Sequence, residues 1–176
     1  MGPLQVAKTK QNVKPLWIET NSPEQTRRVG MRLGKLARPG DIILLVGTLG
    51  AGKTCLTQGI ARGLGISEYA TSPSFVLVRE YQGKLPLYHI DLYRIDSIEE
   101  VAQLGLDDYL YGNGVCVVEW ADKGLSVFPE KHLLIEIQFI SSNKRKLIFV
   151  PRGARYTEML SILEASSQHA RKQQWS

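Results

Sequence analysis

The hydrophobic and polar positions divide the chain into short apolar runs and longer segments with helical spacing. Residues 42–46 form an uninterrupted apolar run, Ile-Ile-Leu-Leu-Val, soon after a Pro-Gly pair, which predicts a buried strand. From Leu56 to Leu64, apolar residues recur at every fourth position, and Gly65 follows. This spacing predicts a helix that buries one face and ends at the glycine.

Two further helices are predicted from their capping residues, and a third from its apolar spacing. Ser22 followed by Pro23 and Gln25 is typical of a helix start, and the helix should end before the next Pro-Gly pair. A similar start at Ser97 predicts a helix that stops at Gly105. The C-terminal helix is predicted from four apolar positions, Tyr156, Met159, Leu160 and Leu163.

The remaining apolar runs predict strands, four of which should pair as two hairpins. These runs cover residues 75–78, 87–93, 115–118, 133–139 and 146–150. A turn at Gln82-Gly83 joins the first two runs, and a turn at 141–143 joins the last two. Beyond them, residues 1–15 are interpreted as a flexible leader, 16–166 as a single domain and 167–176 as a basic, unstructured tail.

The segment Gly47–Thr54 matches the pattern G-x-x-x-x-G-K-[ST] and lies between a predicted strand and a predicted helix. In this pattern the backbone N–H groups surround phosphate oxygens, and the helix N-terminus adds partial positive charge. The lysine reaches the β and γ phosphates, and the hydroxyl binds Mg2+. We therefore predict an α/β, P-loop NTPase-like fold: a mixed, mostly parallel central sheet flanked by helices, with antiparallel hairpins.

Composition and charge restrict the function further. Hydrophobic residues make up 43% of the chain and charged residues 22%, as in soluble globular proteins. The net charge of +5 comes from the ends, because 1–14 hold three lysines and no acid, and 144–176 hold seven Lys/Arg and two Glu. Such ends are typical of solvated tails, although RNA contact stays open. Without an apolar membrane segment or signal, a cytoplasmic protein with no membrane or DNA partner is expected.

Two acids are candidates for the carboxylate that nucleotide hydrolysis requires beside the phosphate loop. Asp91 lies on the predicted strand 87–93, and Glu119 directly follows the apolar run 115–118. A carboxylate at that position is costly to bury unless it is paired or bound to metal. The alternative for each is a strand-end acid that faces solvent.

Other polar and aromatic residues admit both a functional and a structural interpretation. Ser72 and Ser74 could form a switch that senses the γ phosphate, or a simple ST-turn. A histidine among apolar residues, such as His89, is more often a hydrogen-bonded packing residue than a catalyst. A lone arginine such as Arg94 forms a surface ion pair by default. Trp120 could stack on a base, or pack in the core.

Taken together, these segments resemble the TsaE (YjeE) family. The resemblance rests on four motifs and runs from about Asn21 to Val150: Leu49–Thr54, Ser72–Phe75, His89–Arg94 and Glu119-Trp120. The family is the ATPase that bacteria require to form N6-threonylcarbamoyladenosine at position 37 of tRNAs reading codons that begin with A. It works with TsaD and TsaB, while TsaC supplies threonylcarbamoyl-adenylate. The resemblance implies ATP binding at the contact with TsaD and hydrolysis that supports multiple turnover. Contact with tRNA could occur through the complex, and direct contact stays open.

The resemblance also implies site residues. Lys53 and the loop Leu49, Gly50, Ala51 and Gly52 would hold the phosphates of ATP. Thr54 and Glu119 would bind Mg2+, and Asp91 would lie near the γ phosphate, so that Lys53, Asp91 and Glu119 form the catalytic set. The turn with Ser72 and Ser74 would be the switch, and Asn21 and Asn143 would lie near the nucleotide.

Three positions depart from the family. The family usually has Asp where this chain has Thr48, and Thr where it has Cys55 and Ser74. Thr48 removes a negative charge beside the phosphate site, which leaves altered metal binding or a different hydrolysis rate open.

The phosphate loop alone would also suit a small-molecule kinase or a GTP-dependent switch. A kinase usually carries an arginine-rich lid. In this chain there are few arginines near the C-terminus, and two of them, Arg152 and Arg155, do not form an obvious lid. A guanine reader needs Asn-Lys-x-Asp, and the segment 143–146 has Lys where the Asp should be. ATP is therefore the expected nucleotide.

Overall fold

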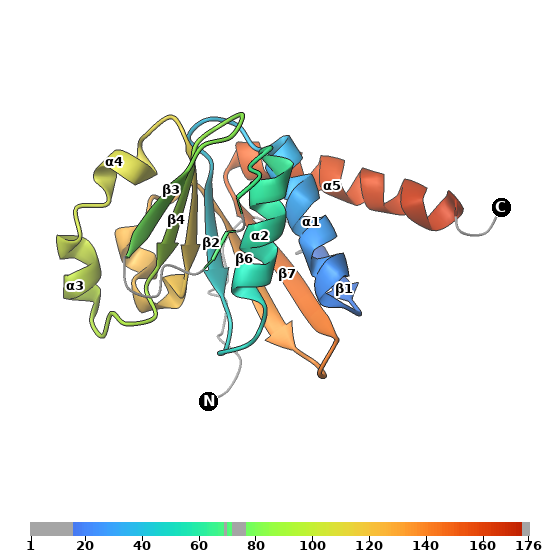
Figure 1. Ribbon diagram of the computed structural model, residues 1–176, viewed down its shortest axis with the longest axis horizontal. Coiled ribbons are helices and arrows are strands. Elements are labelled where there is room, and N and C mark those ends of the chain that lie inside the picture. Colours follow the sequence, from blue (N-terminus) through green and yellow to red (C-terminus); the bar gives the residue numbers. More distant parts are fainter. Residues whose placement is uncertain (1–15, 69, 72–76, 174–176) are drawn as a thin grey trace.

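The computed structural model describes residues 16–68, 70–71 and 77–173. Within these residues seven strands form one sheet, in the order β1-β7-β6-β2-β5-β4-β3 (Figure 1). The strands are β1 (Leu16–Thr20), β2 (Ile42–Val46), β3 (Val78–Tyr81), β4 (Leu87–Asp91), β5 (Val115–Glu119), β6 (His132–Phe139) and β7 (Arg145–Arg152). The helices are α1 (Pro23–Leu36), α2 (Lys53–Gly63), α3 (Ile98–Gln103), α4 (Asp107–Leu110) and α5 (Ala154–Gln173), with 3-10 turns at Ala121–Lys123 and Leu125–Val127.

The centre of the sheet is parallel and its flanks are antiparallel. β2 pairs in parallel with β5 on one side and β6 on the other, and β4 pairs in parallel with β5. The hairpins β3–β4 and β6–β7 are antiparallel, as is the pairing of β1 with β7. The predicted mixed sheet with two hairpins is therefore confirmed.

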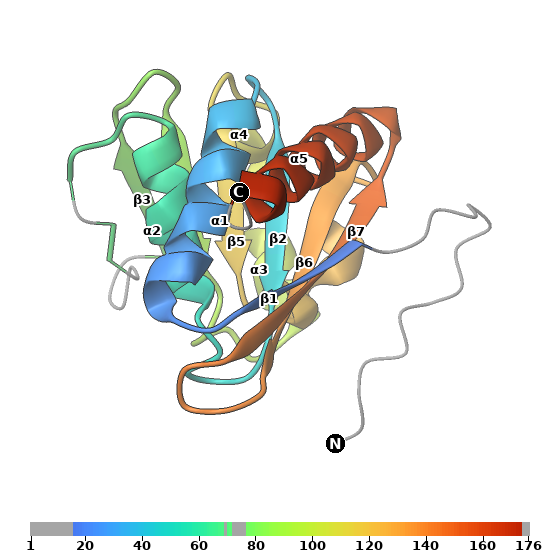
Figure 2. The same cartoon turned by 90° about the vertical axis from the view of Figure 1, so that its right-hand side faces the viewer.

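Strand β2 separates two hydrophobic cores, which explains its unbroken apolar sequence. Its residues Ile43 and Leu45 pack in the core beneath α1, α2 and α5, and its residues Ile42, Leu44 and Val46 pack in the core beneath α3 and α4. Successive side chains of a strand point to opposite faces, so a strand covered on both faces must be apolar throughout. Figure 2 shows α1 between α2 and α5 on the first of these faces.

Helices α1 and α2 pack at close range because glycines face one another. A Cβ atom built on Gly59 would overlap the carbonyl oxygen of Arg27, and one built on Gly30 would overlap that of Leu56. The close packing fixes α2, which begins at Lys53, relative to α1. Ser22 caps α1 as predicted, since its hydroxyl accepts a hydrogen bond from the N–H of Gln25 at 3.2 Å.

Several boundaries differ from the sequence-based predictions. Strand β1 was not expected; it is short and half-exposed, so its apolar pattern is weak, and its backbone pairing with β7 defines it. The strand expected at 75–78 lies mostly outside the described residues, and β3 begins at Val78. The segment 87–93 leaves the sheet after Asp91. The single turn of α4 was also missed.

The C-terminal helix is longer than predicted. Helix α5 runs to Gln173, so the prediction of an unstructured segment from Gln168 onward is wrong for the residues through 173. Leu163 is the last residue of α5 in the described hydrophobic core, and the sequence beyond it lacks glycine and proline, which allows the helix to continue. Among the described helices, none has the length and apolar content that crossing a membrane requires.

We predict that Gly59→Ala lowers the free energy of unfolding by about 2 kcal/mol or more, because the new methyl group would overlap the backbone of α1. Urea unfolding at 25 °C measures the change. Arg28→Ala, on the exposed side of α1, is the control and should stay within about 0.5 kcal/mol of the parent. Equal stability of Gly59→Ala and the parent would contradict the close packing.

Candidate phosphate-binding and metal site

The loop between β2 and α2 has the backbone conformation that its glycines allow. Gly50 and Gly52 have φ angles of 75° and 108°, in the left-handed region that residues with a side chain rarely adopt. Ala51, between them, is fully buried in the core and anchors the loop. The predicted sequence of strand, glycine-rich loop and helix is therefore present, with the N-terminus of α2 at the loop.

Lys53, the first residue of α2, is buried at the mouth of this loop. Its Nζ donates hydrogen bonds to the carbonyl oxygens of Gly47 and Thr48, at 2.6 Å and 2.9 Å. The same nitrogen lies 3.6 Å from the centroid of the Trp120 ring. Burial lowers the pKa of Lys53 from its usual value, while the charges of Glu119 and nearby aspartates oppose this shift. A cationic side chain is thus held where the pattern requires it.

Trp120 reaches Lys53 because of an unusual backbone turn. With φ at 60°, it is the only residue other than glycine in the described ranges that has a positive φ. This turn ends β5, and the Trp120 ring also packs against Tyr93, with 5.0 Å between ring centroids. The Trp120 ring therefore lies at the site and covers the Lys53 ammonium. It does not pack only in the core.

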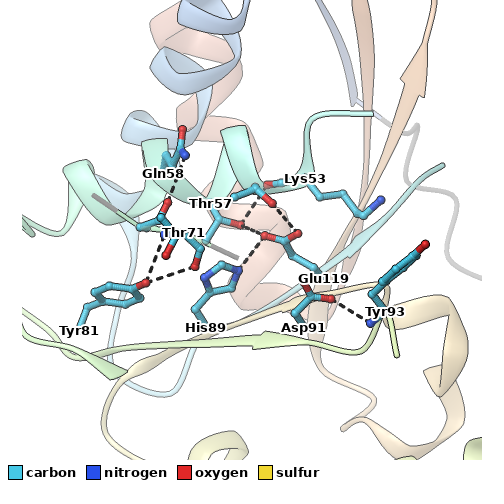
Figure 3. Close-up of polar contacts among 11 residues, drawn as sticks. Lys53, Thr57, Gln58, Thr71, Tyr81, His89, Asp91, Tyr93 and Glu119 are labelled. Carbon is cyan, nitrogen blue, oxygen red and sulfur yellow. Dashed lines mark hydrogen bonds and ion pairs between the residues drawn. The ribbon is translucent and has the colours of Figure 1, made fainter. Parts of the chain in front are cut away.

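Glu119, at the end of β5, is buried and bonded from several sides (Figure 3). Its Oε2 accepts a hydrogen bond from the Thr54 hydroxyl at 2.9 Å. Its Oε1 lies 3.2 Å from the Thr57 hydroxyl and 2.7 Å from Nε2 of His89. The side chain is only 2% exposed. The alternative of a solvent-facing acid is thereby excluded for Glu119.

Asp91 lies beside Glu119 at the same edge of the sheet. The two residues are directly paired in the parallel register of β4 and β5. Asp91 is half-buried, and its Oδ1 accepts a hydrogen bond from the backbone N–H of Tyr93 at 2.9 Å. Ligands of open α/β sheets bind at the carboxyl ends of the strands, which is where both acids lie.

The oxygen donors at the loop fit Mg2+. The Thr54 hydroxyl and the Glu119 carboxylate are hard ligands that contact each other beside the phosphate loop. No group of three or more His, Cys, Asp or Glu residues suited to a metal occurs among the residues that the structure describes. Mg2+ does not need such a cage, because one or two protein ligands and the phosphates of a nucleotide suffice.

The other predicted site residues flank the loop or lie outside the described residues. Asn21 is exposed just before α1. The start of α1 contacts α2, because the Cys55 thiol donates a hydrogen bond to the carbonyl oxygen of Pro23 at 3.2 Å. Asn143 is exposed in the β6–β7 turn. Leu49 is exposed at the tip of the phosphate loop. Ser72 and Ser74, the predicted switch, are outside the described residues.

Comparison with known proteins identifies the family. The model of the family described as "Threonylcarbamoyl adenosine biosynthesis protein TsaE" matches residues 20–147. The chain belongs to the TsaE family. A tRNA threonylcarbamoyladenosine biosynthesis protein TsaE of Bacillus subtilis is 43% identical over 158 residues, which is 89% of this chain and 97% of that protein. One of Treponema pallidum is 41% identical over 128 residues, covering 73% and 95%.

A solved structure supports the same conclusion for the fold. The crystal structure of YdiB from Bacillus subtilis superimposes with a TM-score of 0.78 at 39% identity. The match covers 89% of this chain and 99% of that chain. The predicted P-loop fold and the TsaE family are therefore confirmed, whereas the roles that the resemblance implies for individual residues stay predictions. The structure brings four of those residues together: Lys53, Thr54, Asp91 and Glu119.

Arg145 contacts the phosphate loop, although no motif in the sequence assigned it to the site. From the start of β7, its Nε donates to the carbonyl of Ala51 at 2.8 Å, and its Nη2 to that of Gly50 at 3.3 Å. Its Nη1 donates to the carbonyl of Ser141 at 2.6 Å, and its guanidinium lies over the Phe139 ring. Arg145 thus ties the phosphate loop to the β6–β7 hairpin, and no motif marks such a lone arginine in the sequence.

We predict that Arg145→Lys lowers ATP affinity about tenfold, because lysine keeps the charge but cannot bond both segments at once. Isothermal titration with ATP and Mg2+ measures the affinity. Lys144→Gln is the matched control, since the neighbouring Lys144 side chain is directed toward Glu19, at 3.8 Å. An Arg145→Lys protein that binds ATP like the parent would show that the loop does not depend on this tie.

Proposed function

We propose that this TsaE family member binds ATP with Mg2+ and hydrolyses it to support N6-threonylcarbamoyladenosine formation at position 37 of tRNAs that read codons beginning with A. The observation that carries the proposal is the 2.9 Å contact between the Thr54 hydroxyl and the buried Glu119 carboxylate, beside Lys53. Hydrolysis needs a phosphate-binding cation and oxygen ligands for a metal in one place, and this contact provides the ligands.

Separate groups of the site would bind the phosphates and the metal ion. The backbone N–H groups of the loop and the Lys53 ammonium bind the phosphate oxygens, for which Lys53 must exchange its present carbonyl partners. Thr54 and Glu119 would hold Mg2+, which neutralises charge on the β and γ phosphates when bound. Water attacks the γ phosphorus, and ADP and phosphate are released.

Asp91 and Glu119 differ in surroundings, which supports different roles. Glu119 is enclosed by donors on α2 and β4, so it is suited to orient a ligand and poorly placed to approach an attacking water. Asp91 is half-buried at the end of the adjacent strand, on the predicted γ-phosphate side of the site. We assign Asp91 the positioning of the attacking water.

Membership of the TsaE family supports a proposal about partners. We propose that the protein acts in the cytoplasm with TsaD and TsaB, and that it meets tRNA through that complex. Membership of the TsaE family favours this function over the small-molecule kinase and the GTP-dependent switch.

For cells that contain the protein, we predict that affinity-tagged protein recovers TsaD and TsaB, and that depletion lowers the threonylcarbamoyladenosine content of tRNA. Mass spectrometry of the recovered proteins and of digested tRNA measures both. The tag alone is the control for recovery, and restoring the parent protein is the control for depletion. Full modification of tRNA after depletion would contradict the proposed function.

For the purified protein, we predict that Glu119→Ala lowers ATP hydrolysis by about 100-fold or more and changes ATP affinity far less. The reason is that a metal ligand contributes most in the transition state. Lys53→Ala should instead lose ATP binding, because it removes the charge partner of the phosphates. Glu99→Ala, an exposed acid on α3, is the control. Equal hydrolysis by Glu119→Ala and the parent would remove Glu119 from the mechanism, and equal turnover of GTP and ATP would weaken the assignment of ATP.

A further inference from the structure

The buried histidine of β4 makes a specific contact that packing alone does not require. His89 is fully buried, and its Nε2 lies 2.7 Å from Oε1 of Glu119. Its other ring nitrogen, Nδ1, is buried and has no hydrogen-bond partner among the residues that the structure describes. An aliphatic side chain would fill the same space without the cost of burying two polar atoms, so the contact with Glu119 calls for an explanation.

The contact with Glu119 determines which ring nitrogen of His89 carries the proton. A carboxylate oxygen accepts hydrogen bonds and cannot donate them, so the short contact to Oε1 requires a proton on Nε2. In a neutral ring Nδ1 then carries a lone pair, and an unpaired acceptor is less costly to bury than an unpaired N–H group, which is rare in folded proteins. The ring is therefore fixed as an Nε2–H donor directed at Glu119.

Among the described residues that donate to Oε1, His89 is the one whose proton is not shared. The Thr57 hydroxyl has a single proton and two acceptors, the Lys53 carbonyl at 3.0 Å and Oε1 of Glu119 at 3.2 Å. The His89 contact is shorter than either, and within the described part of the chain its Nε2 has no competing acceptor. The orientation of the Glu119 carboxylate therefore depends mainly on His89, with Thr57 in a supporting position.

The two oxygens of Glu119 consequently have different surroundings. Oε1 is held from β4 and α2, while Oε2 contacts the Thr54 hydroxyl at the start of α2. Rotation of the carboxylate would break the bond to His89 and remove Oε2 from Thr54. Figure 3 shows His89, Thr57 and Glu119 converging, with Lys53 directed to the other side of the carboxylate.

We propose that His89 is a positioning residue for Glu119: its Nε2–H holds the carboxylate so that Oε2 faces the metal position at Thr54. This inference rests on the proposed function, because it concerns the ligands that would hold Mg2+. The sequence favoured a packing histidine. The proposed role adds that the ring directs Nε2–H at Glu119 and thereby affects metal affinity. Hydrogen-bond partners that orient a metal ligand commonly contribute about 10-fold to 100-fold in metal affinity.

Two amide substitutions separate positioning from packing. In His89→Gln the side-chain nitrogen can reach the position of Nε2, whereas in His89→Asn it reaches only the position of Nδ1. Both variants bury one neutral amide, so a loss of packing should affect both. Mn2+ binding to the ADP complex, followed by electron paramagnetic resonance, measures metal affinity. Titration of ADP in EDTA measures nucleotide affinity without metal, and thermal unfolding checks the fold.

We expect His89→Asn to weaken Mn2+ binding about 10-fold to 100-fold, and His89→Gln to stay within about threefold of the parent. ADP affinity in EDTA should be unchanged within about twofold in both. Mn2+ binding by His89→Asn equal to that of the parent would overturn the positioning role. Equal losses in both variants would also overturn it, because they would indicate packing alone. A parent protein that binds neither ADP nor Mn2+–ADP would instead refute the proposed function itself.

A measurement on the parent tests the inference without any substitution of His89. Long-range 15N–1H spectra of the labelled protein report the tautomer of each of the three histidines. His132→Gln and His169→Gln identify the remaining signal as that of His89. We expect the Nε2–H tautomer. A neutral ring with its proton on Nδ1 would overturn the proposal.

Discussion

The site depends on one interaction, the burial of the Glu119 carboxylate among hydrogen-bond donors. A carboxylate that leaves water must recover its hydrogen bonds from the protein, and here Thr54, Thr57 and His89 provide them. These donors come from α2 and β4, while Glu119 belongs to β5. The relative positions of the three elements are therefore linked to the orientation of one side chain, and a shift in any of them would disturb the metal ligands.

The scaffold around this interaction limits such shifts. Helix α2 is held against α1 through glycines that leave no room for a methyl group, and strands β2, β4 and β5 are joined by parallel pairing between two cores. Arg145 adds a tie between the phosphate loop and the β6–β7 hairpin. The loop itself has left-handed glycines and an exposed tip, so its conformation relies on these neighbours.

The parts of the fold with strong local signals could be predicted, and those defined by distant contacts could not. Both ends of β2 and the first residue of α1 were predicted to within one residue of their observed positions. Strand β1 was missed because pairing with β7, more than a hundred residues away, defines it. The end of α5 was misplaced because its last turns lack the apolar spacing that marked its beginning.

For the site, the sequence alone determined the chemistry that is available: a glycine-rich loop with Lys53 and Thr54, and two acids at strand ends. This was possible because the loop is one contiguous segment whose spacing meets a geometric need. Only the tertiary structure decided how these groups combine. It joined Glu119 to His89 and Thr57, placed Trp120 over Lys53 and brought Arg145 to the loop. Such contacts arise from strand order and helix packing, which no local pattern of residues specifies.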